Sequence, residues 1–222
     1  MSGASGSVLD AALSPFDRAS EIVFGILMAI SVTAAFEITV GAELDTRELL
    51  VAALGCNLAW GLIDAAMYLL QQQFERHRNH GLMLELRATA AEEAFRRRVV
   101  EALPPALAPA LTPESFARVR QAARSYSAKR PPFWPPQDFA AAGIICLLVF
   151  ASTFPLVVPF LLIQDPWTAL RASHAVAVAF LFLLGWRLGR WSGASALGSG
   201  LVVAGGGTGL AEACVRLWGC EA

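Results

Sequence analysis

The sequence predicts an all-α integral membrane protein with five transmembrane helices and a helical insert between the second and the third. The first observation is composition. Of the 222 residues, 56% are hydrophobic and only 16% are charged, which is typical of membrane proteins rather than soluble domains. The second is the arrangement of apolar segments of about 20 residues, long enough to cross a bilayer as helices, on both sides of one polar stretch.

Residues 1–20 are expected to form a mobile N-terminus followed by a short interfacial helix. The segment is rich in Gly and Ser at its start, which favours disorder. Ser14 is suited to cap the interfacial helix, and Pro15 is suited to its first position.

Residues 21–73 hold the first two predicted spans, and the first of them covers 21–40. Glu21 and Glu37 lie at its two edges, where a carboxylate needs no special explanation. Met28 lies near its middle. A lone methionine inside an apolar helix is more often a packing residue than a metal ligand.

The second predicted span, 49–70, carries the most informative acid of the chain. Its polar residues recur at one face of a helix and comprise Asn57, Gly61, Asp64 and Tyr68. Met67 flanks that face. An acid inside a membrane span costs a few kcal/mol on insertion scales, so Asp64 is a candidate functional residue. The alternative is an acid that reaches the interface or caps a neighbouring helix.

Residues 74–137 are expected to form a soluble helical insert. No proline occurs over 71–103, so one helix is predicted to leave the membrane and cover that range. A second helix is predicted to begin at Pro113 with Thr112 as its N-cap and to run to about Tyr126.

Residues 138–218 hold three further predicted spans, and 219–222 form a short tail. The third span covers 139–163. Pro155 and Pro159 are predicted to kink or break it, which frees backbone carbonyls inside the membrane. Broken helices in membranes line cavities or pack against protein. A packing kink without a ligand role is an equal alternative.

The fourth span is predicted over 169–188 and the fifth over 196–217. His174 in the fourth is expected to hydrogen-bond to a neighbour rather than to bind a metal. The fifth span contains Gly205 and Gly209, two glycines four residues apart. This GxxxG pattern favours close helix contact.

The distribution of basic residues predicts the orientation in the membrane. Of the 17 Lys and Arg residues, fourteen fall on one side of the five-span topology, and they are Arg18, Arg76, Arg78, Arg87, Arg96, Arg97, Arg98, Arg118, Arg120, Arg124, Lys129, Arg130, Arg187 and Arg190. The other side holds Arg47, Arg171 and Arg216. The positive-inside rule therefore places the N-terminus and the insert in the cytoplasm.

Three segments resemble motifs of one transporter family and occur in the same order. RASEIVFGI (18–26) resembles its R-D-I-V-I-G opening, and STFPLVVPF (152–160) resembles its G-x-x-P-L-x-P-Y/F turn. FLFLLGWRLGRWSG (180–193) resembles its F-x-x-G-x-x-K/R-G-x-x-x-G stretch. With the order of spans and insert, the chain is similar to the vacuolar iron transporter family over about residues 18–218. The resemblance implies transport of Fe²⁺ or Mn²⁺ by a homodimer, often with proton antiport.

The chain also departs from that family. Members carry an acid in the middle of the first span, and Met28 takes that position here, so Asp64 is the acid that this chain keeps in the membrane. The resemblance makes the glutamates of the shorter insert candidates for metal-collecting carboxylates, namely Glu85, Glu92, Glu93, Glu101 and Glu114. A salt-bridged surface is the alternative, because the pairs Glu92/Arg96 and Glu93/Arg97 have i, i+4 spacing.

We therefore expect a divalent-cation transporter in the cytoplasmic membrane of a bacterium. Asp64 and Asn57 would supply oxygen ligands, and Met67 or Met28 would supply sulfur. This set suits Fe²⁺ or Mn²⁺ better than Ca²⁺ or Mg²⁺. The ion is the substrate, and no cofactor is expected. The expected partners are the lipid bilayer and a second copy of the chain, with no nucleic acid.

The alternative function is a membrane scaffold or regulator that moves no ion. In that case the basic helices of the insert would bind anionic lipid or a protein partner. An enzyme is not expected, because the sequence has no HExxH motif, Ser/His/Asp set, phosphate-binding loop or quinone-type His pair.

Overall fold

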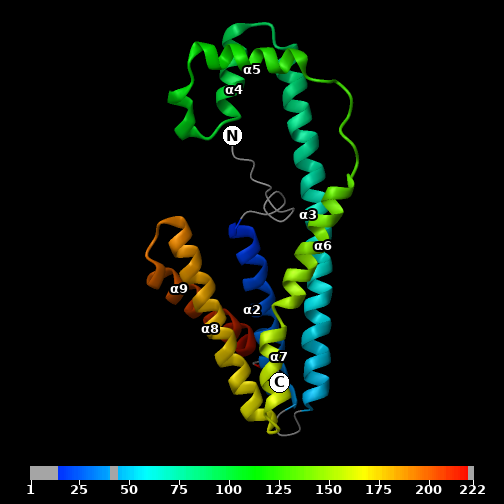
Figure 1. Cartoon of the computed structure of the whole chain (residues 1–222), viewed down its shortest axis with the longest axis vertical. Helices are drawn as coiled ribbons and strands as arrows, with labels where there is room; N and C mark the ends of the chain where they lie inside the picture. The colour runs from blue at the N-terminus through cyan, green and yellow to red at the C-terminus, as the bar shows by residue number, and fades with distance from the viewer. Residues whose placement is uncertain (1–14, 41–44, 220–222) are drawn as a thin grey trace, which may run out of the picture. The chain divides into compact units, whose positions relative to one another are not determined.

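The computed structural model describes residues 15–40 and 45–219 (Figure 1). Helices and their connections make up this part of the chain without a β-strand, which confirms the predicted all-α class. The chain divides into two compact units. Unit 1 comprises the residues up to Tyr68 and those from Pro136 onward, and unit 2 comprises Leu69–Pro135.

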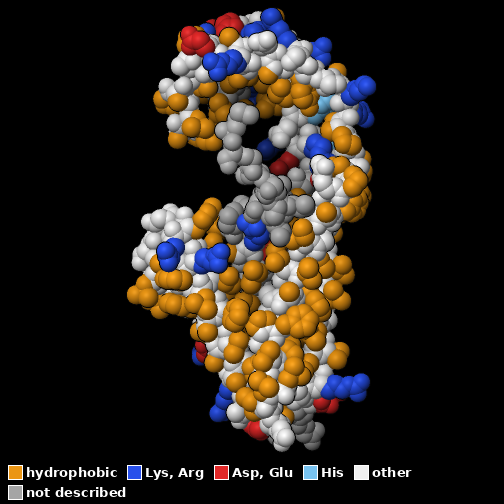
Figure 2. Space-filling model, viewed as in Figure 1, with side chains coloured by type: hydrophobic (Ala, Val, Ile, Leu, Met, Phe, Trp, Pro, Cys, Tyr) orange, Lys and Arg blue, Asp and Glu red, His pale blue; other side chains and the backbone are white. Residues whose placement is uncertain are grey.

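Unit 1 holds the helices that are long and apolar enough to cross a membrane. They are α2 (Pro15–Val40), the first part of α3 (Thr46–Ala88), α6 (Pro136–Ala151), α7 (Phe154–Leu162), α8 (Pro166–Ser192) and α9 (Ala196–Gly219). Four candidate spans result, on α2, on α3, on α6 with α7, and on α8. Hydrophobic side chains cover most of their visible surface (Figure 2). The protein is therefore membrane-embedded. The predicted fifth span falls on α9, whose described apolar part, Ala196–Leu210, is shorter.

Local sequence signals set most helix ends in unit 1. The N–H of Arg47 donates to the Asp45 carboxylate at 2.7 Å and starts α3, and the N–H of Thr168 donates to Asp165 at 2.8 Å and starts α8. Gly193, with φ of 75°, ends α8 in the left-handed conformation. Helix α2 begins at Pro15 and continues without a separate interfacial helix. The predicted Ser14 cap lies outside the described residues.

The predicted break in the third span is confirmed. Helix α6 ends at Ala151 and α7 begins at Phe154, so that Ser152 and Thr153 form a turn between them. Pro155 explains the position of the break, because its ring would clash with the carbonyl four residues earlier, at Ala151. Ser152 and Thr153 are both buried. The turn is therefore packed against protein and not against lipid.

Glycines set the packing between α8 and α9. A Cβ at Gly185 would overlap Val203, and a Cβ at Gly189 would overlap Ser199, so the two helices approach closely at these positions. Gly205 and Gly209, the pair expected to make close contacts, are exposed and meet no neighbouring atom among the described residues. The predicted contact face on α9 therefore makes no such contact within one copy of the chain, and its contact with a second copy stays a prediction.

Unit 2 contains the last part of α3, then α4 (Glu92–Glu101), a 3₁₀ helix η2 (Pro105–Ala110) and α5 (Pro113–Ser125). The prediction of α5 is confirmed, including its cap, because the Thr112 hydroxyl accepts the N–H of Ser115 at 3.3 Å. The prediction of one unbroken helix over 71–103 is wrong. Helix α3 ends at Ala88, and Ala91 is extended before α4 begins.

The core of unit 2 explains that break. Phe95 and Val99 of α4 are buried in one cluster with Leu86 of α3 and with Phe116 and Ala123 of α5. A straight helix would leave the apolar side chains of α4 in water, whereas a turn after Ala88 buries them. Burial of a large apolar side chain is worth about 1.5–3 kcal/mol, more than the one or two helix hydrogen bonds lost at the turn.

Candidate functional site

Two acids from neighbouring helices of unit 1 meet at the candidate site. The carboxyl groups of Glu21, on α2, and Asp64, on α3, lie within hydrogen-bonding range of each other, and both side chains are half-buried. Two ionised carboxylates carry only acceptors, so this contact becomes a hydrogen bond only when one of them holds a proton. One oxygen of each, Oε2 of Glu21 and Oδ2 of Asp64, is buried and meets no donor among the described residues.

The amide of Asn57 connects the face of α3 that carries Asp64 to two other segments. Asn57 is fully buried. Its Nδ2 donates to the carbonyl oxygen of Gly25 on α2 at 2.9 Å and to the hydroxyl of Thr153, in the α6–α7 break, at 2.5 Å. Its Oδ1 has no partner in the described part of the chain. Asn57 thus fixes the position of α3 against α2 and against the helix break.

Glycines allow these helices to approach. A Cβ at Gly25 would overlap the Ser152 side chain and come within 2.8 Å of the Val149 carbonyl oxygen. A Cβ at Gly61 would come within 2.9 Å of the Cys146 carbonyl oxygen. Contacts this short to backbone cannot be relieved by a side-chain rotation, so both positions require glycine.

The two methionines expected as sulfur ligands are not brought to the acid pair. Met67 is 58% exposed, so it faces away from the buried side of α3. Met28 is half-buried on α2, seven residues beyond Glu21, or about 10 Å along a helix. No group of three His, Cys, Asp or Glu residues that could hold a metal ion occurs within the described ranges. What the structure assembles is a carboxyl pair.

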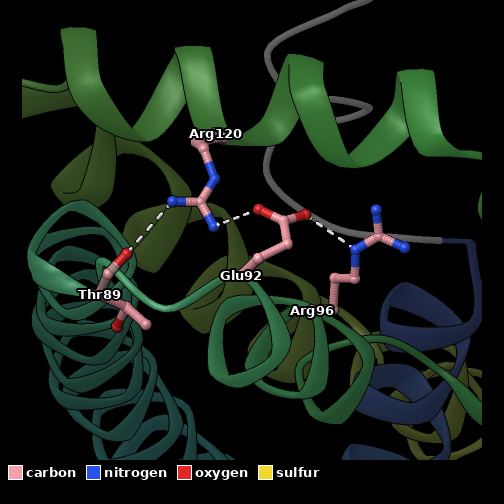
Figure 3. A network of polar contacts seen from close by, with 4 residues as sticks. All are labelled: Thr89, Glu92, Arg96 and Arg120. Atoms are coloured by element: carbon pink, nitrogen blue, oxygen red, sulfur yellow. Dashed lines mark hydrogen bonds and ion pairs between the residues drawn. The ribbon is translucent and has the colours of Figure 1, made fainter.

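The glutamates expected to collect metal in unit 2 are engaged by arginines. Glu85 pairs with Arg98 at 2.9 Å. Glu92 pairs with Arg96 at 2.8 Å and with Arg120 at 2.7 Å (Figure 3). The hydrogen bond from Arg96, aided by the charge of Arg120, holds the pKa of Glu92 below its usual value.

The other members of that glutamate set differ in their partners. Glu93 is exposed and forms no ion pair with any described residue, including Arg97 at the expected spacing. Glu101 pairs with Arg98 at 3.4 Å. Glu114 lies in the first turn of α5, where the backbone hydrogen bond at the helix start lowers the pKa of its carboxyl. The geometry around Glu85, Glu92 and Glu101 is that of a salt-bridged surface.

His174 forms a separate polar contact between α8 and α2, as predicted. Its Nε2 lies 3.0 Å from the Thr33 hydroxyl oxygen. That hydroxyl lies 2.9 Å and 3.0 Å from the carbonyl oxygens of Ala29 and Ile30 and can donate its proton there. The direction of the hydrogen bond between His174 and Thr33 follows the tautomer of the imidazole, with Nε2 as the donor when it carries the proton. The imidazole lines a cavity of about 230 Å³ with Glu37, Thr208 and Glu212.

The role of Glu21 was missed from the sequence, although a signal for it exists. Glu21 is 19 residues before the end of α2 at Val40, and Asp64 is 18 residues after the start of α3 at Thr46. In two antiparallel helices joined by a short loop, residues at equal distances from the loop lie side by side, because each residue rises about 1.5 Å.

Comparison with known proteins gives no further assignment. No protein-family model matches the chain, and no curated protein is similar to it. The resemblance to vacuolar iron transporters therefore depends on the three sequence motifs and on the order of the predicted helices.

Proposed function

We propose that the protein transports divalent transition-metal cations, Fe²⁺ or Mn²⁺, across a membrane, and that Glu21 and Asp64 form the ion-binding pair. The observation that carries the proposal is the contact between these two carboxyl groups on membrane-length helices. A single acid within a span is already costly, and a second acid beside it adds charge repulsion. A bound cation or a shared proton removes that cost.

The chemistry of the pair supports a hard or borderline divalent cation. Two carboxylates, completed by water, are a common way to hold such ions. The choice of Fe²⁺ and Mn²⁺ comes from the family resemblance. The same pair can hold one proton when no metal is bound, so exchange of metal for proton is the coupling that we propose.

The proposal includes a five-span topology in a bacterial cytoplasmic membrane, with the N-terminus and unit 2 in the cytoplasm. The 14-to-3 division of basic residues supports this orientation. We also propose a homodimer. The exposed Gly205 and Gly209 on α9 offer a small-residue face for a second copy.

The test is metal uptake into liposomes that contain the purified protein, with Fe²⁺, Mn²⁺, Ca²⁺ and Mg²⁺ compared. Asp64→Asn and Glu21→Gln keep side-chain size and remove one charge each, so each is expected to reduce flux at least about tenfold, the effect of about 1.4 kcal/mol. Asp64→Glu is expected to retain part of the flux. Glu48→Gln, at an exposed acid in the first turn of α3, is the matched control and should transport normally.

Native flux in Asp64→Asn and Glu21→Gln would remove the pair from the mechanism. Absence of flux for every ion in the unmodified protein would favour the scaffold function.

One observation supports that second candidate. Seven exposed cations of unit 2 form no ion pair with any residue that the structure describes, and they are Arg78, Arg87, Arg97, Arg118, Arg124, Lys129 and Arg130. Binding of the protein to vesicles with anionic lipid would then be the relevant assay.

A further inference from the structure

Four buried polar atoms lie in succession around one face of α3 without a hydrogen-bond partner among the described residues. They are Oδ1 of Asn57, Nε1 of Trp60, Oδ2 of Asp64 and Oε2 of Glu21. Buried polar atoms in proteins are nearly always paired with protein or with ordered water. A proton shared by the acid pair can join the two carboxyl groups to each other, but it leaves Asn57 and Trp60 without a partner, so these atoms identify a feature of this face and not scattered defects.

The spacing makes these atoms neighbours. Asn57 and Trp60 are three residues apart on α3, and Trp60 and Asp64 are four apart. Residues at these spacings have Cβ atoms about 5–6 Å apart on a helix surface. Glu21 continues the series through its contact with Asp64. The four atoms therefore belong to residues that follow one another along one face of α3, with Glu21 of α2 beside the last of them.

Either placement of the amide atoms of Asn57 leaves one end of the amide unpartnered. The Gly25 carbonyl, 2.9 Å from Nδ2, is only an acceptor. Reversal of the amide would place Oδ1 against that carbonyl oxygen, which is repulsive, and would leave the N–H₂ group unpartnered instead. Rotation of this side chain therefore does not satisfy the site.

The mixture of atoms points to water as the occupant. Three of the four atoms are acceptors, whereas the indole N–H of Trp60 is only a donor. A metal ion serves the oxygens and cannot serve the N–H. Water donates to the oxygens and accepts from the N–H, and buried waters typically make two to four such bonds.

We propose that a file of internal water molecules runs along this face of α3, from the Glu21–Asp64 pair to Asn57 beside the α6–α7 break. It is the polar path by which a cation or proton at the acid pair reaches Ser152 and Thr153 at the break. The path goes beyond the proposed function, because it exists whichever ion moves. The opposite face of α3, with Leu58 and Leu62 exposed, lies against lipid.

Cysteine labelling with a charged, water-soluble thiol reagent tests the path in a protein whose four native cysteines are replaced. Trp60→Cys and Asp64→Cys place thiols on the path. Leu62→Cys and Leu58→Cys, on the lipid face of the same helix, are the matched controls, and position 62 lies between 60 and 64 in depth. Because the reagent reacts with thiolate in water, labelling at 60 and 64 should be at least about tenfold faster than at 58 and 62.

A second measurement uses the unmodified protein, since Trp60→Cys itself creates space. Hydroxyl radicals generated by radiolysis of water in place should oxidise Trp60, whereas Phe182, which packs against Gly200 of α9, should remain unmodified. Equal labelling at all four positions would overturn the proposal. So would fast labelling at 60 without oxidation of the native Trp60. If positions 60 and 64 are hydrated but the protein moves no metal, the path stands and the transport proposal fails. If the protein moves metal but these positions are not hydrated, the transport proposal stands and the path fails.

Discussion

At the scale of single residues, Asn57 determines how the acid pair is held. Its side chain is fully buried and connects α3 to the Gly25 carbonyl on α2 and to Thr153 in the break. Loss of one partner from a buried hydrogen bond leaves the other unsatisfied, and the cost is that of burying an unpaired polar group.

Asn57→Leu has nearly the same volume and cannot donate to either partner. The expected result is a loss of about 1–3 kcal/mol in the free energy of unfolding, because the two buried hydrogen bonds that the amide donates, to the Gly25 carbonyl and to the Thr153 hydroxyl, are both lost. Asn79→Leu is the control, since Asn79 lies exposed on the same helix and should change stability by about 0.5 kcal/mol or less. Denaturant unfolding in mixed micelles measures both, and equal effects of the two substitutions would contradict the assignment.

At the scale of elements, the approach of α2 to α6 depends on one residue without a side chain. A Cβ at Gly25 would meet the Ser152 hydroxyl and, at 2.8 Å, the Val149 carbonyl oxygen. The hydroxyl of Ser152 is already held by that carbonyl at 2.6 Å. The α6–α7 break and α2 therefore pack with no room for a methyl group between them.

Gly25→Ala should force α2 away from α6 and reduce stability by about 1–3 kcal/mol, as overpacking of a full core does. Gly143→Ala on α6 is the matched control, because no atom lies within 4 Å of the added Cβ and alanine is the better helix former by about 1 kcal/mol. The two variants should thus shift the thermal unfolding temperature in opposite directions. A stabilising Gly25→Ala would show that the helices are not in close contact.

In unit 2, the network of Glu92 joins α4 to α5 through Arg120 and to its own helix through Arg96. Arg120 also donates to the Thr89 carbonyl at 3.3 Å (Figure 3). These groups surround the turn at which α3 ends, so the network supports the same turn that the apolar cluster requires.

The network predicts a pH dependence of stability. The hydrogen bond from Arg96 and the charge of Arg120 lower the pKa of Glu92 from 4.5 in the folded state. The contribution of ionised Glu92 to the stability of the fold is therefore fully present above pH 4.5. It is lost as the pH falls through the pKa that Glu92 has in the folded state, which is lower than 4.5. Glu92→Gln should unfold at a lower temperature than the native protein at neutral pH, and the difference should vanish in acid. Glu93→Gln, the neighbour without an ion pair, should show no such convergence.

At the scale of the whole molecule, the charges and the apolar helices are segregated. Lys and Arg gather on unit 2, and the membrane-length helices belong to unit 1 (Figure 2). The 11 basic residues of the central stretch are the main reason for placing unit 2 in the cytoplasm.

The orientation predicts the result of cysteine labelling in intact cells. In a cysteine-free background, Gly219→Cys should react with an impermeant reagent added outside, and Arg97→Cys should react only after the cells are opened. The reverse pattern would invert the topology. Reaction at neither position until the cells are opened would indicate an even number of spans, with α9 not crossing the membrane.

The sequence by itself determined the features that depend on a few adjacent residues. The start of α5 at Thr112 and the interruption near Pro155 are examples, because a cap or a proline acts within about four residues. The single face shared by Asn57, Gly61 and Asp64 follows from the helical repeat alone. The apolar composition and the all-helical class have the same local origin.

Only the tertiary structure decided which groups meet. It placed Glu21 against Asp64, ended α3 at Ala88 so that Phe95 could be buried, and left Gly205 exposed while Gly185 made the close contact. Each outcome depends on which helices pack together and at what depth, and this is decided by the burial of many side chains at once. A periodic pattern reports which face of a helix is buried, but not the neighbour that covers it.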